Sequence, residues 1–145
     1  TYVPLISSGV AGPLGVLHLP RLWLKASLEA RNKIAPGYPA LSKGYDSMVL
    51  GALGLDTEAV RKFIVEQRPT YPQFEAWVKK QPGVKLDKAT IYKHNQSILG
   101  YIHDDATRKS ILSANGITDE SGVNPGAVDL NNLDDWFEFY NAELK

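Results

Sequence analysis

Apolar residues in this chain recur at intervals of three and four residues, the spacing that places them on one face of an α-helix. In residues 20–30, for example, Leu22, Ala26 and Ala30 share such a face. The same spacing in residues 42–53 predicts a second helix, and it returns in later stretches. No sustained alternation of apolar and polar residues, the pattern of a half-buried strand, is present. The pattern therefore predicts an all-α fold.

Residues that commonly begin helices precede most of these stretches. Pro20 suits a first helical turn, because its φ angle is fixed and its missing N–H is not needed there. Asp56, Asp87 and Asp104 can each accept a backbone hydrogen bond as an N-cap. The sequence TYPQ starting at Thr70 has the form of a capping box. We therefore expect helices to begin at these five positions.

We expect a compact single-domain helical bundle spanning residues 1–145, with about six or seven short helices. Residues 1–19 are rich in glycine and proline, which predicts an irregular N-terminal arm. Residues 118–132 are polar and rich in turn-forming residues, which predicts a long loop. A last helix is expected after this loop, with Asp134 and Asp135 in its first turn, where the helix dipole favours carboxylates.

The composition is that of a folded protein, with 43% hydrophobic and 22% charged residues. The absence of cysteine excludes disulfides, zinc–thiolate sites and cysteine nucleophiles. No apolar run is long enough for a transmembrane helix, and no basic region precedes the apolar N-terminal stretch as in a signal peptide. These features predict a cytoplasmic protein without a membrane partner.

Charge is distributed unevenly along the chain, although the formal net charge is zero. Residues 1–100 hold thirteen basic and seven acidic residues, a net charge of +6, whereas residues 101–145 hold three and nine, a net charge of −6. The two parts are expected to attract each other within one fold. A surface that docks a partner protein, or a second copy of the chain, is the alternative interpretation.

Several familiar chemistries lack their sequence motifs. No G-x-S-x-G nucleophile elbow and no phosphate-binding G-x-x-x-x-G-K-[ST] loop is present, and no serine stands in a context that indicates activation. Residues 78–88 contain four lysines but no interleaved aromatic residues for base stacking, so no nucleic-acid partner is expected.

The three histidines, His18, His94 and His103, do not have the spacing of a helical metal pair. His103 precedes Asp104 and Asp105, but N-capping explains these carboxylates better than metal binding does, and His103 is expected to be solvated. Capping likewise explains the other pair of adjacent aspartates. The sequence therefore predicts neither a metal nor another cofactor.

The first predicted helix carries the strongest candidate site. Arg21 and Lys25 share one face, and a desolvated lysine can act as a base or a Schiff-base amine while a neighbouring arginine holds a carboxylate or phosphate. Tyr38, Tyr45 and Asp46 follow closely enough to fold back against this helix and close a pocket. A solvated stripe of charges is the competing interpretation.

Four segments resemble a bacterial family: LGVLHLPRLWLKASLEA, GYPALSKGYDSMVLGALGLDTEAVRKFI, FEAWVKKQ and LDDWFEF. The chain is similar over nearly its whole length to the domain-of-unknown-function family five thousand and sixty-nine. No activity comes with that resemblance. The break PGYPALSKGYD is longer and richer in proline than the family pattern, so that Tyr38 and Tyr45 compete for one role. The family pattern falls on Leu19, Pro20, Arg21, Lys25, Tyr38, Asp46, Gly54 and Asp135.

The charged face of the first predicted helix and the family resemblance indicate the same region of the chain. We expect a small anionic or zwitterionic molecule to bind near Arg21, Tyr38, Tyr45 and Asp46. A cofactor-independent acid–base enzyme, with Lys25 or His18 as base and a tyrosine as acid, is the second hypothesis. The third is a protein–protein adaptor that uses the charge asymmetry. If the charged groups instead pair with one another inside the fold, they are structural.

Overall fold

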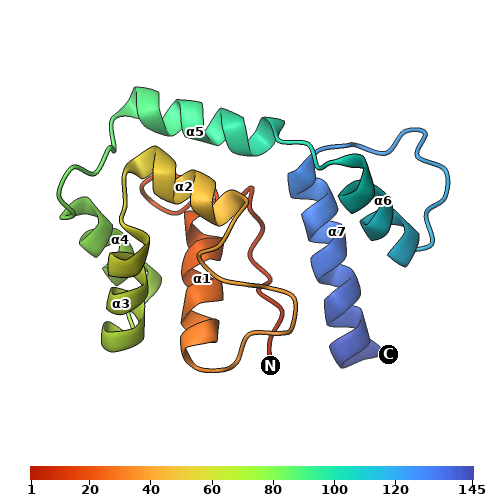
Figure 1. The fold of residues 1–145 in the computed structure, drawn as a ribbon, viewed down its shortest axis with the longest axis horizontal. Coiled ribbons are helices and arrows are strands. Elements are labelled where there is room, and N and C mark those ends of the chain that lie inside the picture. Colours follow the sequence, from red (N-terminus) through yellow and green to blue (C-terminus); the bar gives the residue numbers. More distant parts are fainter.

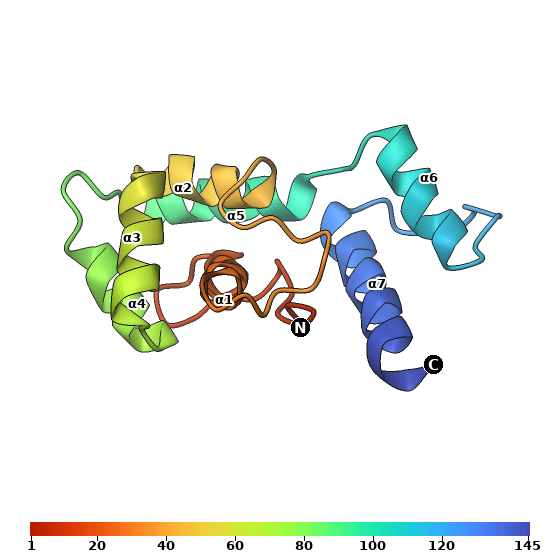
Figure 2. The same ribbon diagram turned by 60° about the horizontal axis from the view of Figure 1, so that its bottom comes forward.

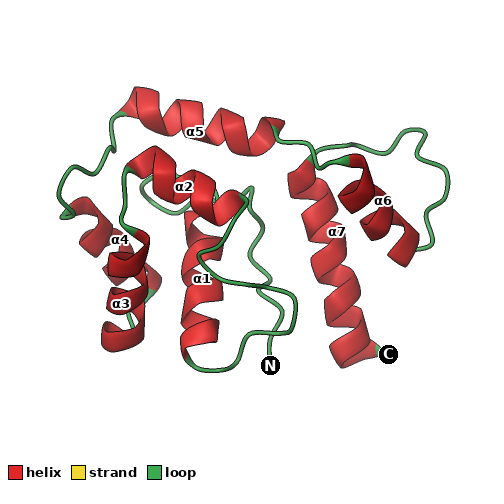
Figure 3. Ribbon diagram, in the orientation of Figure 1, coloured by secondary structure: helices red, strands yellow, loops and turns green.

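The computed structural model describes residues 1–145, and it confirms the all-α prediction. Seven α-helices and a C-terminal π-helical turn account for the regular structure (Figures 1 and 3). The only β-type pairings are two isolated bridges. The elements are α1 (Leu19–Ala30), α2 (Tyr45–Leu53), α3 (Thr57–Gln67), α4 (Tyr71–Lys79), α5 (Lys88–Gly100), α6 (Asp105–Ala114), α7 (Ala127–Phe139) and η1 (Tyr140–Leu144).

The helices form two groups that α5 connects. Helices α1 to α4 lie together at one end of the molecule, and α6 and α7 lie at the other, while α5 runs beside α2 from one group to the other (Figures 1 and 2). The N-terminal arm and the segment between α1 and α2 occupy the space between α1 and α7 (Figure 1). This arrangement brings residues from both ends of the sequence to one place.

The main hydrophobic core fills the first group of helices. Fourteen buried side chains from residues 16–78 pack together there, with Phe74, Leu22 and Leu53 fully enclosed. Two smaller clusters continue the apolar interior, one of them between α6 and α7 around Leu112 and Leu130. Burial of such side chains is the main favourable contribution to folding, at roughly 1.5–3 kcal/mol each.

The predicted helix starts are confirmed at all five positions. Pro20 lies in the first turn of α1, and Thr70 forms a complete capping box at the start of α4. The side chains of Asp56, Asp87 and Asp104 each accept a hydrogen bond from the backbone N–H three residues later. These contacts involve neighbouring residues only, which is why the sequence indicates them correctly.

Two predictions about the last helix were wrong. The predicted loop 118–132 ends early, because α7 already begins at Ala127. The N–P–G sequence before it suggested continued irregular structure, but Asn124 closes a local turn there and Leu130 packs against α6. Asp134 and Asp135 therefore lie within α7 rather than in its first turn, and they are not capping residues.

The N-terminal arm is irregular, as predicted, but it is firmly attached. Tyr2 exchanges backbone hydrogen bonds with Lys33 and Ala35 in the segment that follows α1. The arm then returns to α1 through His18, which is the N-cap residue of that helix. None of the helices combines the length and apolar character that crossing a membrane requires.

Candidate functional site

A cavity of about 280 Å³ lies where the N-terminal arm, α1, the segment before α2, and α7 meet. All six residues that the sequence singled out border it: His18, Arg21, Lys25, Tyr38, Tyr45 and Asp46. We call it the mixed-charge cavity, because basic and acidic side chains share its wall. The other residues that line it are Ser8, Gly37, Lys43, Gly44, Tyr101, His103, Asn131, Asp134 and Asp135.

His18 has an unusual backbone conformation that aims its ring into this site. Its φ of 73° lies in the left-handed region, which a residue with a side chain adopts at an energetic cost. The imidazole is 2% exposed and bonded on both nitrogens. Nδ1 lies 2.9 Å from Ser8 Oγ, and Nε2 lies 2.6 Å from Asp46 Oδ1. The surrounding structure thus fixes the ring on both sides.

The protonation states of His18 and Asp46 follow from their burial and their hydrogen-bond partners. Burial lowers the pKa of His18 below its ordinary value of 6.5, against the raising effect of Asp46, so that the ring is neutral near pH 7. An ionised carboxylate can only accept hydrogen bonds. The proton of the neutral ring therefore sits on Nε2 and is donated to Asp46, which leaves Nδ1 as an acceptor for the Ser8 hydroxyl.

Asp46 is the centre of a buried network. Besides His18, its carboxylate accepts hydrogen bonds from Lys25 Nζ at 3.0 Å and from the Leu41 backbone N–H at 2.7 Å. Burial disfavours its ionisation, but the hydrogen bond from His18 and the charge of Lys25 outweigh burial and lower the pKa of Asp46. Lys25 and Asp46 thus form an ion pair, to which a charged His18 would add an unpaired charge.

Arg21 is also fully engaged within the protein. Its guanidinium donates to both carboxylate oxygens of Asp135, at 2.7 and 3.0 Å. The same group donates to the carbonyl oxygens of Pro4 and Ile6 in the arm, at 2.6 and 2.9 Å. Its Cζ lies 5.8 Å from the centre of the Tyr38 ring. Arg21 therefore joins the arm, α1 and α7 at the cavity wall.

Several polar groups at the cavity have no hydrogen-bond or ion-pair partner within the protein. The buried Tyr38 hydroxyl lies next to the Asp135 carboxylate without a hydrogen bond of good geometry, and Lys43 and Asp134 take part in no ion pair. Burial and the neighbouring carboxylates of Asp135 and Asp134 raise the pKa of Tyr38, so that its hydroxyl stays protonated. Burial, together with Glu138 and Asp135, raises the pKa of Asp134. The exposed Lys43 and the half-buried Asp134 are accessible to a ligand.

Tyr45 has a different role from Tyr38, although the sequence left them in competition. Its hydroxyl donates to the Ile98 carbonyl oxygen at 2.9 Å, and burial raises its pKa to about 12. Its ring centre lies 5.4 Å from that of His18. Tyr45 therefore packs the imidazole from one side and ties α2 to α5, whereas Tyr38 keeps a free hydroxyl at the cavity.

Sequence reasoning missed several residues of this site. Ser8 has no local signal, because its partner His18 stands ten residues later in an irregular arm. Asp135 was assigned to capping, although the opposite net charges of the two parts of the chain were a hint of such a pairing. His103, expected to be solvated, is half-buried and lies 2.8 Å from Asn131 Oδ1 through Nε2. No group of three or more His, Asp or Glu side chains is arranged to hold a metal ion.

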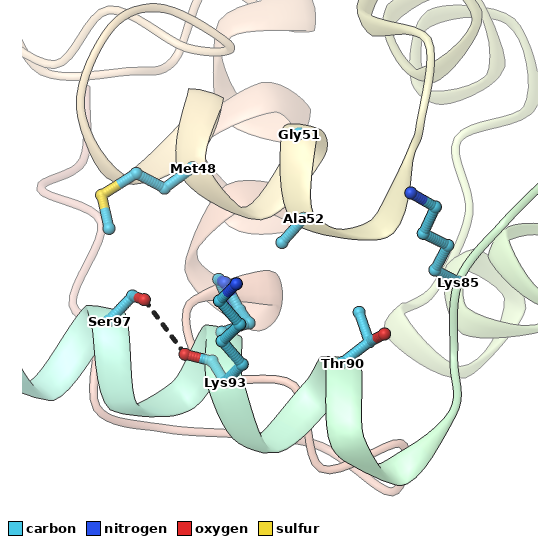
Figure 4. A pocket seen from close by; sticks show the side chains of 8 residues that line it. Met48, Gly51, Ala52, Lys85, Thr90, Lys93 and Ser97 are labelled. Atoms are coloured by element: carbon cyan, nitrogen blue, oxygen red, sulfur yellow. Dashed lines mark hydrogen bonds between the residues drawn. The ribbon is translucent and has the colours of Figure 1, made fainter.

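A second hollow of about 450 Å³ lies between α2 and α5 (Figure 4). Lys85 and Lys93 line this hollow, but no acidic residue does. Its histidine, His94, is held by the Leu17 carbonyl oxygen at 2.9 Å, and Ser97 donates to the carbonyl oxygen of Lys93 (Figure 4). Buried polar groups do not converge here as they do at the mixed-charge cavity, which is therefore the better candidate.

Comparison of the chain with protein-family models, curated proteins and solved structures gave no match. The family resemblance of the sequence therefore stays a prediction. The function of the cavity has to be inferred from its geometry and its charges.

Proposed function

We propose that the mixed-charge cavity binds a small zwitterionic molecule, one that carries both an ammonium group and a carboxylate. The observation that carries this proposal is the presence of two unpaired opposite charges at one cavity, those of Lys43 and Asp134. A ligand carboxylate would pair with Lys43 and a ligand ammonium with Asp134. The free Tyr38 hydroxyl supplies a further hydrogen bond.

The balance of charge favours a zwitterion over a simple anion. Arg21 and Lys25 are neutralised by Asp135 and Asp46, and His18 is uncharged. The remaining charges, one positive and one negative, cancel. A ligand with one negative charge alone would meet no net positive field at this wall, whereas a zwitterion would satisfy both free groups.

The size of the cavity is consistent with a small metabolite. Its volume of about 280 Å³ lies just below the usual range for drug-sized ligands. Aromatic rings of Tyr38, Tyr45 and Tyr101 border it, which suits a ligand with a short apolar part between its charged ends. Arg21 and Lys25 then act mainly by holding the walls in place.

The test is a thermal-shift screen of zwitterionic, anionic and cationic metabolites against the wild-type protein. A ligand at a hundred-fold excess over its Kd stabilises the native state by about 2.7 kcal/mol, so binding appears as a higher Tm. We expect zwitterions of amino-acid size to raise the Tm. The double variant Lys43→Gln with Asp134→Asn, which removes only exposed or half-exposed groups, should fold and lose the shift.

A matched control is the double variant Lys62→Gln with Glu66→Gln on α3, which removes the same charges from exposed positions away from the cavity. It should respond to ligand like the wild type. If anions alone shift the Tm, or if the Lys43/Asp134 variant responds fully, zwitterion binding at this cavity is wrong.

A further inference from the structure

The Ser8 hydroxyl is the end of a buried hydrogen-bonded chain that runs through His18 to Asp46. The two contacts measure 2.9 Å and 2.6 Å, and all three residues are at most 2% exposed. Ser8 Oγ has no other side-chain or backbone partner, so the imidazole alone orients it. Serine, histidine and aspartate in this order are the groups of a nucleophile, its base and the residue that positions the base.

The direction of the hydrogen bonds is the one that activation requires. Neutral His18 donates from Nε2 to Asp46, and its bare Nδ1 accepts from the serine hydroxyl. A base in this state can take the serine proton as Oγ forms a new bond. The two ring nitrogens are exchanged relative to the familiar serine hydrolases, but the roles depend on the geometry and not on which nitrogen is used.

Other features of the site support a reactive rather than a merely structural chain. His18, the central residue of the Ser8–His18–Asp46 hydrogen-bonded chain, has a left-handed backbone conformation that stores strain. Lys25 neutralises Asp46, and this helps to keep the imidazole uncharged and able to accept a proton. Ser8 and His18 both line the mixed-charge cavity, where a ligand would be held.

We propose that Ser8 is a nucleophile toward small acyl compounds, with His18 as general base and Asp46 as the residue that positions it. This inference rests on the proposed function, because the acyl compound would be an ester of a small zwitterion-like acid bound in the same cavity.

The reaction balances without a cofactor. Ser8 Oγ attacks the carbonyl carbon while its proton passes to His18 Nδ1. The carbon–oxygen bond to the leaving alcohol then breaks, and the alcohol takes the proton from His18. Water repeats the two steps on the acyl-serine, which releases the acid and restores the Ser8 hydroxyl.

The test uses methanesulfonyl fluoride, a probe small enough for this cavity. Attack by Ser8 forms an oxygen–sulfur bond and expels fluoride, with the serine proton leaving to solvent through His18. Intact mass and peptide mapping locate the adduct. We expect one methanesulfonyl group on Ser8, none on Ser8→Ala, and normal labelling of the control Ser7→Ala, which changes the neighbouring half-buried serine.

Two further readouts separate activation from a structural role. His18→Asn should slow labelling of Ser8 by about a hundred-fold or more, the usual contribution of a general base. In the wild type, the labelling rate should rise with pH and level off at a lower pH than a histidine with the ordinary pKa would give, because burial lowers the pKa of His18. If His18→Asn does not fold, the pH profile of wild-type labelling tests whether His18 is the base.

The failure of this inference is distinguishable from the failure of the proposed function. If zwitterions raise the Tm but folded wild-type protein is not labelled at Ser8, or Ser7 is labelled equally, Ser8 is not a nucleophile and binding stands. A labelling rate that is independent of pH also overturns the role of His18. If Ser8 is labelled but no zwitterion raises the Tm, the nucleophile stands and zwitterion binding is wrong.

Discussion

Arg21 and Asp135 lie 114 residues apart in the sequence and are joined by two hydrogen bonds in the buried cavity wall. Theirs is the one ion pair that connects the basic first hundred residues with the acidic remainder. It also holds the N-terminal arm, through the carbonyl oxygens of Pro4 and Ile6. The attraction expected from the uneven charge is thus concentrated in a single contact, and this contact shapes the candidate site.

The substitution Asp135→Asn should strongly destabilise the protein. It leaves the buried Arg21 charge without its partner, a change that typically costs about 3–5 kcal/mol. The neighbouring substitution Asp134→Asn is the matched control. Because the folded state raises the pKa of Asp134, its ionised form is disfavoured there, and the variant should be as stable as the wild type or more so near pH 7. Urea unfolding of both variants measures the difference, and equal losses would contradict the structural role of Arg21.

The free energy of unfolding should fall as the pH is lowered through the range in which the His18 imidazole takes up a proton. Its folded pKa lies below 6.5, so the unfolded chain binds more protons just below that pH. The free energy of unfolding is therefore highest above pH 6.5 and should decrease by up to about 1.4 kcal/mol per pH unit down to the folded pKa. The contribution of Asp46, whose pKa is lowered from 3.8, is lost only at more acidic pH. Urea unfolding between pH 8 and 5 should show the first decrease in the wild type and a flatter curve for His18→Asn.

The substitution Lys25→Met should raise the pKa of His18. The positive charge of Lys25 is one of the influences that lower this pKa, and without it Asp46 has only the imidazole as a cationic partner. NMR titration of the His18 ring protons measures the change directly. Lys62→Met on α3 is the control and should leave the His18 titration as in the wild type. A pKa unmoved by Lys25→Met would mean that the Lys25–Asp46 pair does not set the state of the imidazole.

Tyr38 and Tyr45, two of the tyrosines that line the cavity, should respond differently to loss of their hydroxyls. Tyr38→Phe removes a buried hydroxyl that has no partner, so the free energy of unfolding should stay constant or rise by about 1 kcal/mol. Tyr45→Phe removes a 2.9 Å hydrogen bond to the Ile98 carbonyl oxygen, which then keeps only the longer contact from the Tyr101 backbone N–H, and should cost about 0.5–1.5 kcal/mol. Thermal unfolding of the two variants provides the comparison. A large loss in Tyr38→Phe would indicate that this hydroxyl serves the fold rather than a ligand.

The helical architecture could be predicted because its signals are local. The spacing of Leu22 and Ala26, and the cap at Asp56, act over three or four residues, and the structure confirms both. The start of α7 was predicted wrongly for the same reason, because only local signals can be recognised in the sequence. The turn-forming residues before Ala127 suggested a longer loop, since the apolar contact that stabilises the start of this helix comes from α6.

The candidate site was predictable only in part. Arg21 and Lys25 stand out on one helix face, and Asp46 follows near enough to join them, so the sequence by itself indicated two of the segments that meet at the cavity, α1 and the start of α2. It could not determine how the charges are used. Asp135 pairs with Arg21, and Ser8 forms a hydrogen bond with His18, only because a distant helix and an irregular arm fold against α1. Pairing of charges and hydroxyls depends on distances of a few ångströms between remote segments, which periodicity and capping do not encode, and so the tertiary structure alone decided it.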